Sequence, residues 1–541
     1  SSQTDWDSTE IREYLGKFNS MYGVFANTKI YLEDNFDTDT VCQSISLLAL
    51  TERGLARHEL SDLMEGKIDI FYQLYFILVQ NEDLFMLPES IVEQQIINIS
   101  KEEILKYRTR LIRYFESVGT ERAVIELCWQ LVMLPDREGL VDVLSSIKNW
   151  NLIHTNSSLY FAGIDRVLSK EQWDQVAYNW KNQLAANPNQ YSEKEIYTIS
   201  DGFNALNRIE DAVDAIQILI DRGGDAFSMA SYHQQIASLY EDWGNDCAID
   251  HIEQAIRFLE MTEEQAFVQN KIDTYIAGAY IYAFFLDKQD SFVEQKRSIM
   301  DTLNKWLLNA VSLTKQVSYA NSNYLILFYH NVAYVYWNIA QYKQALEYID
   351  CALSVSCPDK SLTVSDLQLR AQIYNDIYCE QNEYLSEETG MLTVGENSDN
   401  EYLILAEKDL IKALELQQQL LYKEGSFSDV NGLAGLHYVM SQNLGYRGYY
   451  EKAIEEIDMA LELENQADFK QDLYATYYQA AIVRFGAYNK WKKKPFLIGS
   501  LECLNKAEEE IMCNETTDAY YYLEDVQKLR ECILKELRKM K

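Results

Sequence analysis

The stretch VAYVYWNIAQYKQALEYIDCAL, residues 332–353, decides the fold of this chain. Small residues recur in it at helical spacing, and a tyrosine follows the first of them after three positions. The members of the pattern are Ala333, Tyr336, Ala340, Ala345, Ala352 and Leu353. Small side chains let two helices approach closely, while tyrosine and leucine fill the space between neighbouring helix pairs. The stretch therefore predicts two packed helices joined by a short turn.

Two other stretches repeat this pattern. They are MSQNLGYRGYYEKAIEEIDMAL, residues 440–461, and IASLYEDWGNDCAIDHIEQAI, residues 236–256, in which the turn is one residue shorter. The matching residues are Ser441, Leu444, Gly448, Ala453, Ala460 and Leu461 in the former, and Ala237, Tyr240, Gly244, Ala248, Ala255 and Ile256 in the latter. The three copies resemble the tetratricopeptide repeat. This resemblance implies a TPR-like α-solenoid superhelix whose concave surface is lined by the first helices.

The repeats are longer than the usual repeat of about 34 residues. The second-helix positions Ala406 and Ala453 are 47 residues apart, and Ser500 follows after another 47. One pair also carries an insertion, SEETGMLTVGENSDNEY, at residues 386–402. Extended helices or inserted loops account for the extra length.

The array also has room for copies that the pattern does not mark. Ala248 and Ala345 are 97 residues apart, which leaves space for one further pair around Ala279 and Ala310. A weaker copy covers residues 196–220. We therefore expect the solenoid to run from about residue 191 to the end of the chain.

Nine polar or aromatic residues fall at groove positions of the matched repeats. They are Gln234, Ser238, His330, Tyr334, Trp337, Gln372, Asn375, Tyr438 and Gln442. Side chains of this kind that packing does not need can bind a peptide or a protein surface. They can equally be ordinary contacts between neighbouring repeats. The sequence leaves both interpretations open.

The charge of the chain restricts its partners. The 541 residues include 84 acidic and 48 basic side chains, which gives a formal net charge of −36. Binding to phosphate needs clustered lysines and arginines that release counterions. A surface this acidic repels nucleic acid and anionic membranes, so we expect protein partners instead.

Composition also indicates fold class and compartment. The chain holds only 5 prolines and 21 glycines, and its apolar residues recur mostly at helical spacing, which predicts an all-α protein. Its nine cysteines form no Cys-x-x-Cys motif, as expected in a reducing compartment. No signal peptide and no membrane-spanning run is found in the sequence. These features predict a cytoplasmic protein.

The front third begins with a helix–turn–helix pattern. In SLLALTERGLARHELSDLMEG, residues 46–66, an apolar helix breaks at Arg53 and Gly54, and a second helix is predicted to begin at once with Leu55.

A third helix is predicted over residues 68–80, followed by a short strand or wing at 81–90 and another helix from near Ser90. Three helices and a wing describe a winged helix. A DNA-reading helix would carry several basic or amide side chains. The third helix instead offers Asp69, Gln73 and Gln80 among bulky apolar residues, so we expect it to be buried and not to read DNA.

This front region resembles the segment after the nucleotide-binding domain in STAND-type NTPases with a NACHT-like module, including the bacterial antiviral STAND proteins. The residues that carry the resemblance are the elbow residues Arg53, Gly54, Leu55, Glu59 and Leu60, and Arg122, Glu126, Leu127, Gln130 and Leu131 further on. The order of winged helix, helical linker and repeats also matches that family.

The resemblance implies a role. In such a family the winged helix holds the nucleotide domain inactive, and ligand binding to the repeats permits oligomerisation and an effector activity. In bacteria it implies antiviral defence with a phage protein as ligand. Because the chain begins with Ser1, we expect it to be the C-terminal part of a longer protein. ATP and Mg²⁺ are expected only in that missing N-terminal domain.

No catalytic motif is present. The sequence lacks a Walker A loop, a Gly-x-Gly-x-x-Gly loop, a His-Glu-x-x-His pair and a Gly-x-Ser-x-Gly elbow. Its six histidines form no close ligand pair in sequence. We therefore name no catalytic, cofactor-binding or metal-binding residue, and expect no cofactor in this chain. By itself the chain is not expected to be an enzyme.

These observations predict four regions. Residues 1–35 adjoin the missing nucleotide-binding domain, 36–118 form the winged-helix-like domain, 119–190 the helical linker and 191–541 the TPR-like solenoid. The leading hypothesis is the ligand-sensing part of a STAND NTPase. Two alternatives stay open, a stand-alone TPR scaffold for cellular proteins and a peptide-gated winged-helix regulator.

Overall fold

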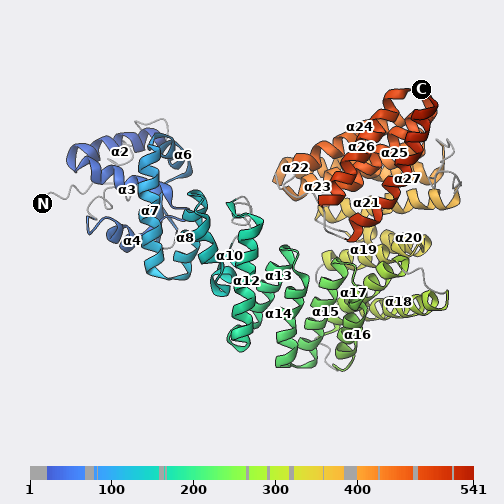
Figure 1. The fold of residues 1–541 in the computed structure, drawn as a ribbon, viewed down its shortest axis with the longest axis horizontal. Helices are drawn as coiled ribbons and strands as arrows, with labels where there is room; N and C mark the ends of the chain where they lie inside the picture. The colour runs from blue at the N-terminus through green and yellow to red at the C-terminus, as the bar shows by residue number, and fades with distance from the viewer. Residues whose placement is uncertain are drawn as a thin grey trace. The chain divides into compact units, whose positions relative to one another are not determined.

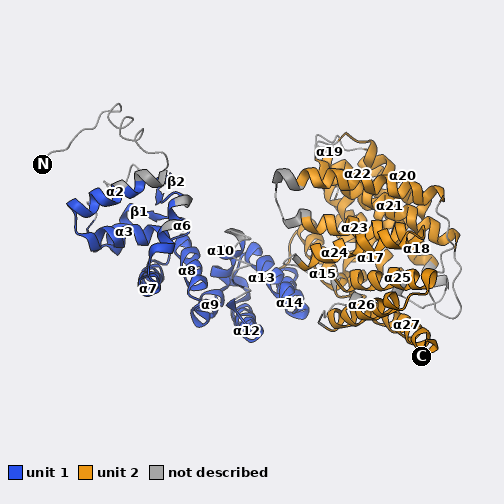
Figure 2. Cartoon of the chain, turned by 90° about the horizontal axis from the view of Figure 1, so that it is seen from above, with its two compact units in different colours: residues 1–221 blue, residues 222–541 orange. Residues whose placement is uncertain are grey.

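A computed structural model gives the fold (Figure 1). The structure describes residues 21–67, 78–81, 83–156, 164, 167–262, 267–288, 293–315, 322–356, 359–382, 399–424, 427–466, 473–513 and 517–540. The described residues are almost entirely helical, so the predicted all-α fold is confirmed. The chain divides into two compact units, residues 1–221 and residues 222–541, which Figure 2 colours separately.

Unit 1 contains a small sheet among helices. Its elements are α2 (Met21–Asn35), α3 (Thr38–Leu50), β1 (Leu55–Ala56), α4 (Arg57–Leu63), β2 (Val79–Asn81), β3 (Leu84–Met86), α6 (Glu89–Asn98), α7 (Lys101–Val118), α8 (Glu121–Met133), α9 (Arg137–Leu144), α10 (Ile147–Asn156), α12 (Lys170–Ala186), the 3₁₀ turn Pro188–Gln190, α13 (Glu193–Ala205) and α14 (Ile209–Arg222). The strand order is β1-β3-β2, and β3 is antiparallel to both neighbours.

The helix–turn–helix prediction is confirmed in outline and wrong in two details. The chain does break between α3 and α4 at Gly54, but Leu55 lies in strand β1, so the second helix begins only at Arg57. Val79 and Gln80, predicted to end the third helix, pair with β3 instead, because the chain turns back there into a hairpin. The rest of that predicted helix, residues 68–77, lies outside the described residues.

Unit 2 is an array of helix pairs (Figure 1). The pairs are α15 (Ala226–Asp242) with α16 (Cys247–Glu260), α17 (Val268–Lys288) with α18 (Val293–Thr314), α19 (Ser322–Asn338) with α20 (Tyr342–Ser354), α21 (Lys360–Gln381) with α22 (Glu401–Glu424), α23 (Phe427–Tyr446) with α24 (Tyr450–Gln466), and α25 (Leu473–Trp491) with α26 (Lys494–Cys513); α27 (Thr517–Lys539) follows. The three marked pairs are thus confirmed. The pair expected around Ala279 and Ala310 is α17 with α18, and both alanines are fully buried. Most of the insertion, residues 386–398, lies outside the described residues.

The turn within each marked pair explains one of the small residues. Ala340, Gly244 and Gly448 have φ values of +56°, +63° and +74°. In all three turns the next amide donates to the carbonyl five residues earlier, as Gln341 does to Tyr336 at 2.9 Å. A left-handed residue with this bond ends a helix sharply and favours a residue with little or no side chain. This position therefore carries a small residue because of its left-handed backbone as well as its packing.

The elbow of unit 1 is held by side chains of α8. Arg122 donates to the carbonyl of Gly54 at 2.5 Å and also pairs with Glu59. Gln130 donates to the carbonyl of Leu50 at 2.8 Å. Two of the resemblance residues of α8 therefore bond to the elbow or to the end of α3, although they lie far from it in sequence.

Glu126 is a third residue of α8 that bonds in this region. Its Oε1 accepts bonds from the amide of Glu52 at 3.1 Å and from Gln130 at 2.9 Å, and the residue is 1% exposed. Burial raises the pKa of Glu126 from an ordinary 4.5 to about 7. Desolvation thus outweighs the hydrogen bonds that favour the carboxylate.

Substituting Gly54 is expected to destabilise unit 1 strongly. A Cβ on Gly54, at φ +80°, would lie 2.3 Å from the carbonyl oxygen of Phe85, whereas a Cβ on Gly66, at φ +83°, would meet nothing within 4 Å. We expect Gly54→Ala to cost more than about 3 kcal/mol of unfolding free energy, and the control Gly66→Ala about 1 kcal/mol. Urea unfolding followed by circular dichroism measures both, and equal losses would contradict this account.

The buried carboxyl of Glu126 is expected to make stability depend on pH. Since its folded pKa of about 7 exceeds its ordinary 4.5, the folded state keeps a proton that the unfolded state loses. The unfolding free energy should therefore fall as pH rises from 4.5 to 7, by up to roughly 1.4 kcal/mol per pH unit. Glu126→Gln should remove this slope, and Glu121→Gln, which changes an exposed residue of the same helix, should retain it. Calorimetry between pH 5 and 7.5 tests the difference; identical slopes in the two variants would refute it.

Candidate functional site

The first helices of neighbouring pairs form one continuous layer in unit 2. Helix α17 packs on α19, α19 on α21, α21 on α23, and α23 on α25. In the part of the chain that the structure describes, no two second helices of neighbouring pairs pack to a similar extent. The array is therefore tighter on the side of the first helices, which is the side where the nine predicted groove residues lie.

Gln234 and Ser238 lie on α15. The side-chain oxygen of Gln234 accepts a hydrogen bond from the hydroxyl of Thr274 on α17, at 2.8 Å. Ser238 is exposed. Gln234 thus connects two successive first helices, while Ser238 faces solvent.

His330 connects α19 to α21. Its Nδ1 lies 2.7 Å from Oδ1 of Asp366, a carboxylate that is only 2% exposed. A buried carboxylate needs a donor close by, because desolvation without one is costly. His330 therefore stabilises the contact between these two helices.

Trp337 and Gln372 converge on a second carboxylate, that of Asp376 on α21. The indole N–H of Trp337 donates to Oδ2 at 2.6 Å, and the amide of Gln372 donates to Oδ1 at 3.2 Å. Desolvation raises the pKa of Asp376 to about 6, against the effect of these two donors. Both donors are neutral, so the carboxylate is bound by hydrogen bonds and not by an ion pair.

Asn375, Tyr438 and Gln442 lie further along the layer. Asn375 is buried and accepts a hydrogen bond from the amide of Asn443 on α23 at 2.9 Å. Asn443 donates a second bond to the carbonyl of Leu403 at 2.9 Å. On α23 itself, the amide of Gln442 donates to the hydroxyl of Tyr438 at 3.4 Å.

Five of the nine predicted groove residues therefore bridge neighbouring first helices: Gln234, His330, Tyr334, Trp337 and Asn375. These contacts are the inter-repeat contacts that the sequence left open as an alternative. They fix the positions of the first helices. Two of the five, His330 and Tyr334, also line a pocket.

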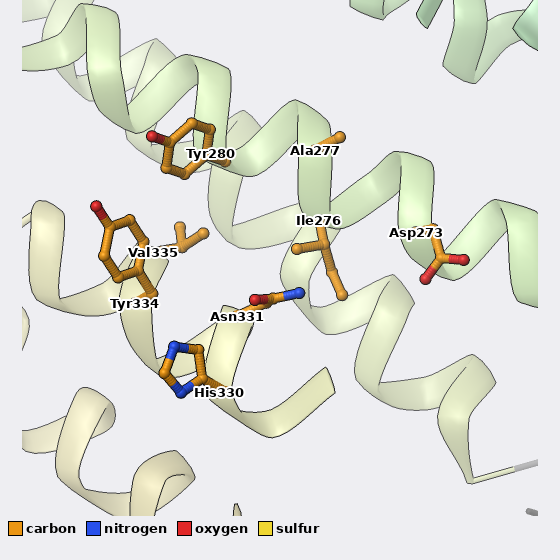
Figure 3. Close-up of a pocket in the computed structure, with 8 residues that line it drawn as sticks. All are labelled: Asp273, Ile276, Ala277, Tyr280, His330, Asn331, Tyr334 and Val335. Carbon is orange, nitrogen blue, oxygen red and sulfur yellow. The ribbon is translucent and has the colours of Figure 1, made fainter. Parts of the chain in front are cut away.

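This pocket lies between α17 and α19 and has a volume of about 520 Å³ (Figure 3). Its lining residues are Asp273, Ile276, Ala277, Tyr280, His330, Asn331, Tyr334 and Val335. Figure 3 shows the rings of Tyr280 and Tyr334 at one end and the carboxylate of Asp273 at the other. The two rings are stacked, with centroids 5.8 Å apart and planes inclined by 28°.

The aromatic end of the pocket continues along α19. The ring of Tyr334 lies 5.3 Å from that of Trp337, inclined by 59°. Offset and tilted ring contacts of this kind are favourable and rigid. The pocket therefore has a preformed aromatic wall.

The polar end of the pocket is acidic. Oδ1 of Asp273 accepts bonds from the hydroxyl of Tyr324 at 2.8 Å and from the amide of Gln269 at 3.3 Å. Burial raises the pKa of Asp273, against the effect of these two neutral donors. No lysine or arginine is among the residues that line the pocket.

Asp273 and Tyr280 were not predicted from the sequence. They belong to α17, the first helix of the pair that the repeat pattern left unmarked. Aligning Ala279 with Ala333 would have placed Tyr280 at the position of Tyr334. No comparable signal points to Asp273.

The described residues offer neither a metal site nor a membrane-spanning helix. No three His, Cys, Asp or Glu side chains gather there as metal ligands. None of the helices described is both long and apolar enough to cross a membrane.

No protein-family model matches the sequence, and no curated protein matches it. Solved structures give distant similarities. A STAND protein with a tetratricopeptide repeat sensor from Pyrococcus horikoshii is 14% identical with a TM-score of 0.35, and the match covers 100% of this chain and 68% of that one. Yeast Tom70 is 13% identical with a TM-score of 0.37, covering 77% and 83%. A monomeric mutant of IFIT1 with Gppp-AAAA is 13% identical with a TM-score of 0.38, covering 82% and 89%. At this level they indicate neither a family nor a ligand, and the helix-pair fold is inferred from this chain's own contacts.

The structural role of His330 can be tested against its neighbour. We expect His330→Leu to cost about 2–4 kcal/mol of unfolding free energy, because it leaves the carboxylate of Asp366 buried without its donor. Asn331→Leu should change the unfolding free energy by no more than about 0.5 kcal/mol, since Asn331 is exposed and its side chain has no hydrogen-bond partner among the described residues. Thermal unfolding measures both, and equal stability of the two variants would show that His330 is not needed for packing.

Proposed function

We propose that unit 2 binds a polypeptide across its first helices. The observation that carries this proposal is the pocket between α17 and α19, with its aromatic wall of Tyr280 and Tyr334 and its open carboxylate Asp273. Tyrosine and tryptophan supply large, rigid contact areas and are enriched where proteins bind one another. A layer of first helices that is fixed by its own hydrogen bonds loses little conformational entropy on binding.

We further propose that this chain is the sensing part of a STAND NTPase. The support is that some of the residues that carry the resemblance bond to one another, as Arg122 does to Gly54 and Glu59. The strand order β1-β3-β2, with α3 before β1 and α4 after it, is also the order of a winged helix. In this proposal that module restrains a preceding nucleotide domain, which would bind the ATP and Mg²⁺.

The proposed ligand is a phage protein, whose binding would release the nucleotide domain and permit oligomerisation of the full-length protein in the cytoplasm. This part rests on the family resemblance. The acidic chain and the absence of catalytic motifs agree with binding to protein rather than to nucleic acid, and with a chain that is not an enzyme on its own.

Capture from lysates tests the proposal. The purified chain is incubated with lysates of phage-infected and uninfected cells, and bound proteins are identified by mass spectrometry. We expect a phage protein bound by the wild type and by Tyr178→Ala, a variant at an exposed tyrosine of unit 1, and at least about tenfold less of it bound by Tyr334→Ala.

Other outcomes would contradict it. Capture of the same host proteins from both lysates would favour the stand-alone scaffold over the viral sensor. Equal capture by Tyr334→Ala would place binding away from this pocket. Salt-sensitive DNA binding in a gel shift would favour the winged-helix regulator.

A further inference from the structure

We infer that the pocket between α17 and α19 binds the side chain of an arginine on the bound polypeptide. The inference rests on the proposed function and adds to it the chemistry of the partner. Three features of the pocket carry it: a carboxylate without a cation, an apolar floor, and an aromatic wall.

The carboxylate is that of Asp273, whose bonds to Tyr324 and Gln269 come from neutral donors. Two cations of the first helices are bound elsewhere. Lys271 donates to the carbonyl of Thr262, and Arg370 pairs with carboxylates of the second helices α20 and α22. Helix α19 contains no lysine or arginine at all. A cation entering the pocket would therefore meet an uncompensated negative charge.

The other charged groups around the pocket do not neutralise its negative charge. His330 is held against Asp366, and Asp376 is held by Trp337 and Gln372. Each of these pairs adds a carboxylate to the layer of first helices and none adds a lysine or arginine. An anionic ligand group would be repelled here, as it would by the chain as a whole.

The floor and wall suit the rest of an arginine side chain. Ile276 and Ala277 lie between the two ends of the pocket and Val335 lies beside the tyrosines, and together they offer an apolar path for the methylene stem (Figure 3). Asp273 and Tyr280 are seven residues apart on α17, so they are separated by about 10 Å along the helix. A long side chain can therefore reach the carboxylate while its own backbone lies near the tyrosines.

Arginine fits these features better than the alternatives. Its planar guanidinium can bond both oxygens of one carboxylate, which the ammonium of lysine does less well. An apolar side chain would fill the floor but leave Asp273 and the amide of Asn331 without a partner from the ligand. Such unpaired polar groups are a strong source of discrimination.

The test uses defined small probes on the full chain. Binding of Nα-acetyl-arginine N-methylamide is titrated by saturation-transfer difference NMR, alongside the citrulline, lysine and glutamate analogues. Citrulline has nearly the shape of arginine without its charge. We expect the arginine probe to bind, the citrulline probe to bind roughly tenfold more weakly or not at all, and the glutamate probe not to bind.

Matched variants locate the binding. Asp273→Asn should weaken the binding of the arginine probe roughly tenfold. Asp301→Asn removes the same charge from an exposed site on the second helix α18 and should leave binding unchanged. Asp273 is itself exposed to the pocket, so both variants are expected to fold, which circular dichroism checks. Equal binding of arginine and citrulline, equal binding of arginine and lysine, or full binding to Asp273→Asn would each overturn the inference.

The two proposals can fail separately. If a polypeptide binds in a manner sensitive to Tyr334→Ala while the arginine probe does not bind, the inference is wrong and the proposed function stands. If the arginine probe binds and Asp273→Asn abolishes this binding, but the binding of no polypeptide is sensitive to Tyr334→Ala, the inference about arginine stands and the proposed function is wrong.

Discussion

The close approach of two helices within each pair is the constraint on which unit 2 depends. Ala333, Ala345 and Ala352 are at most 1% exposed, and a larger side chain at any of them would separate the helices. Because each pair buries only part of its apolar surface, neighbouring pairs must stack to bury the rest. The tight turn at Ala340, with its left-handed backbone, keeps the second helix directly against the first.

Stacking through the first helices then determines the chemistry of their exposed side. Side chains that bridge neighbouring first helices are mostly polar, such as His330 with Asp366 and Trp337 with Asp376. These two bridges each place a carboxylate in the layer and pair it with a donor that is not a lysine or an arginine. The same contacts that align the helices therefore concentrate negative charge on one side of the array, next to a wall of aromatic rings.

The sequence predicts the helix pairs well and the candidate site only in part. Small residues at a fixed spacing have one main cause, close packing with a sharp turn, so Ala333, Gly448 and their equivalents could be located without the structure. The strand β1 could not, because two residues beside Gly54 give no periodic signal and pair with β3 some 30 residues later. Asp273 was missed for a similar reason, since one carboxylate on a helix is usually solvated and only the neighbouring helix makes it part of a pocket.

The structural and binding interpretations of the groove residues are compatible, and the pocket shows how. Tyr334 stacks on Tyr280 and so joins α19 to α17, yet both side chains are only partly buried by this contact and still line the pocket. A binding wall made of inter-repeat contacts is already ordered before a ligand arrives. Its side chains lose their conformational entropy when the protein folds, so little more is lost on binding. Buried residues that bond to a neighbouring first helix, such as Asn375 with Asn443, then support the layer. Exposed residues that line the pocket, such as Asn331 and Asp273, are the ones left to recognise a partner.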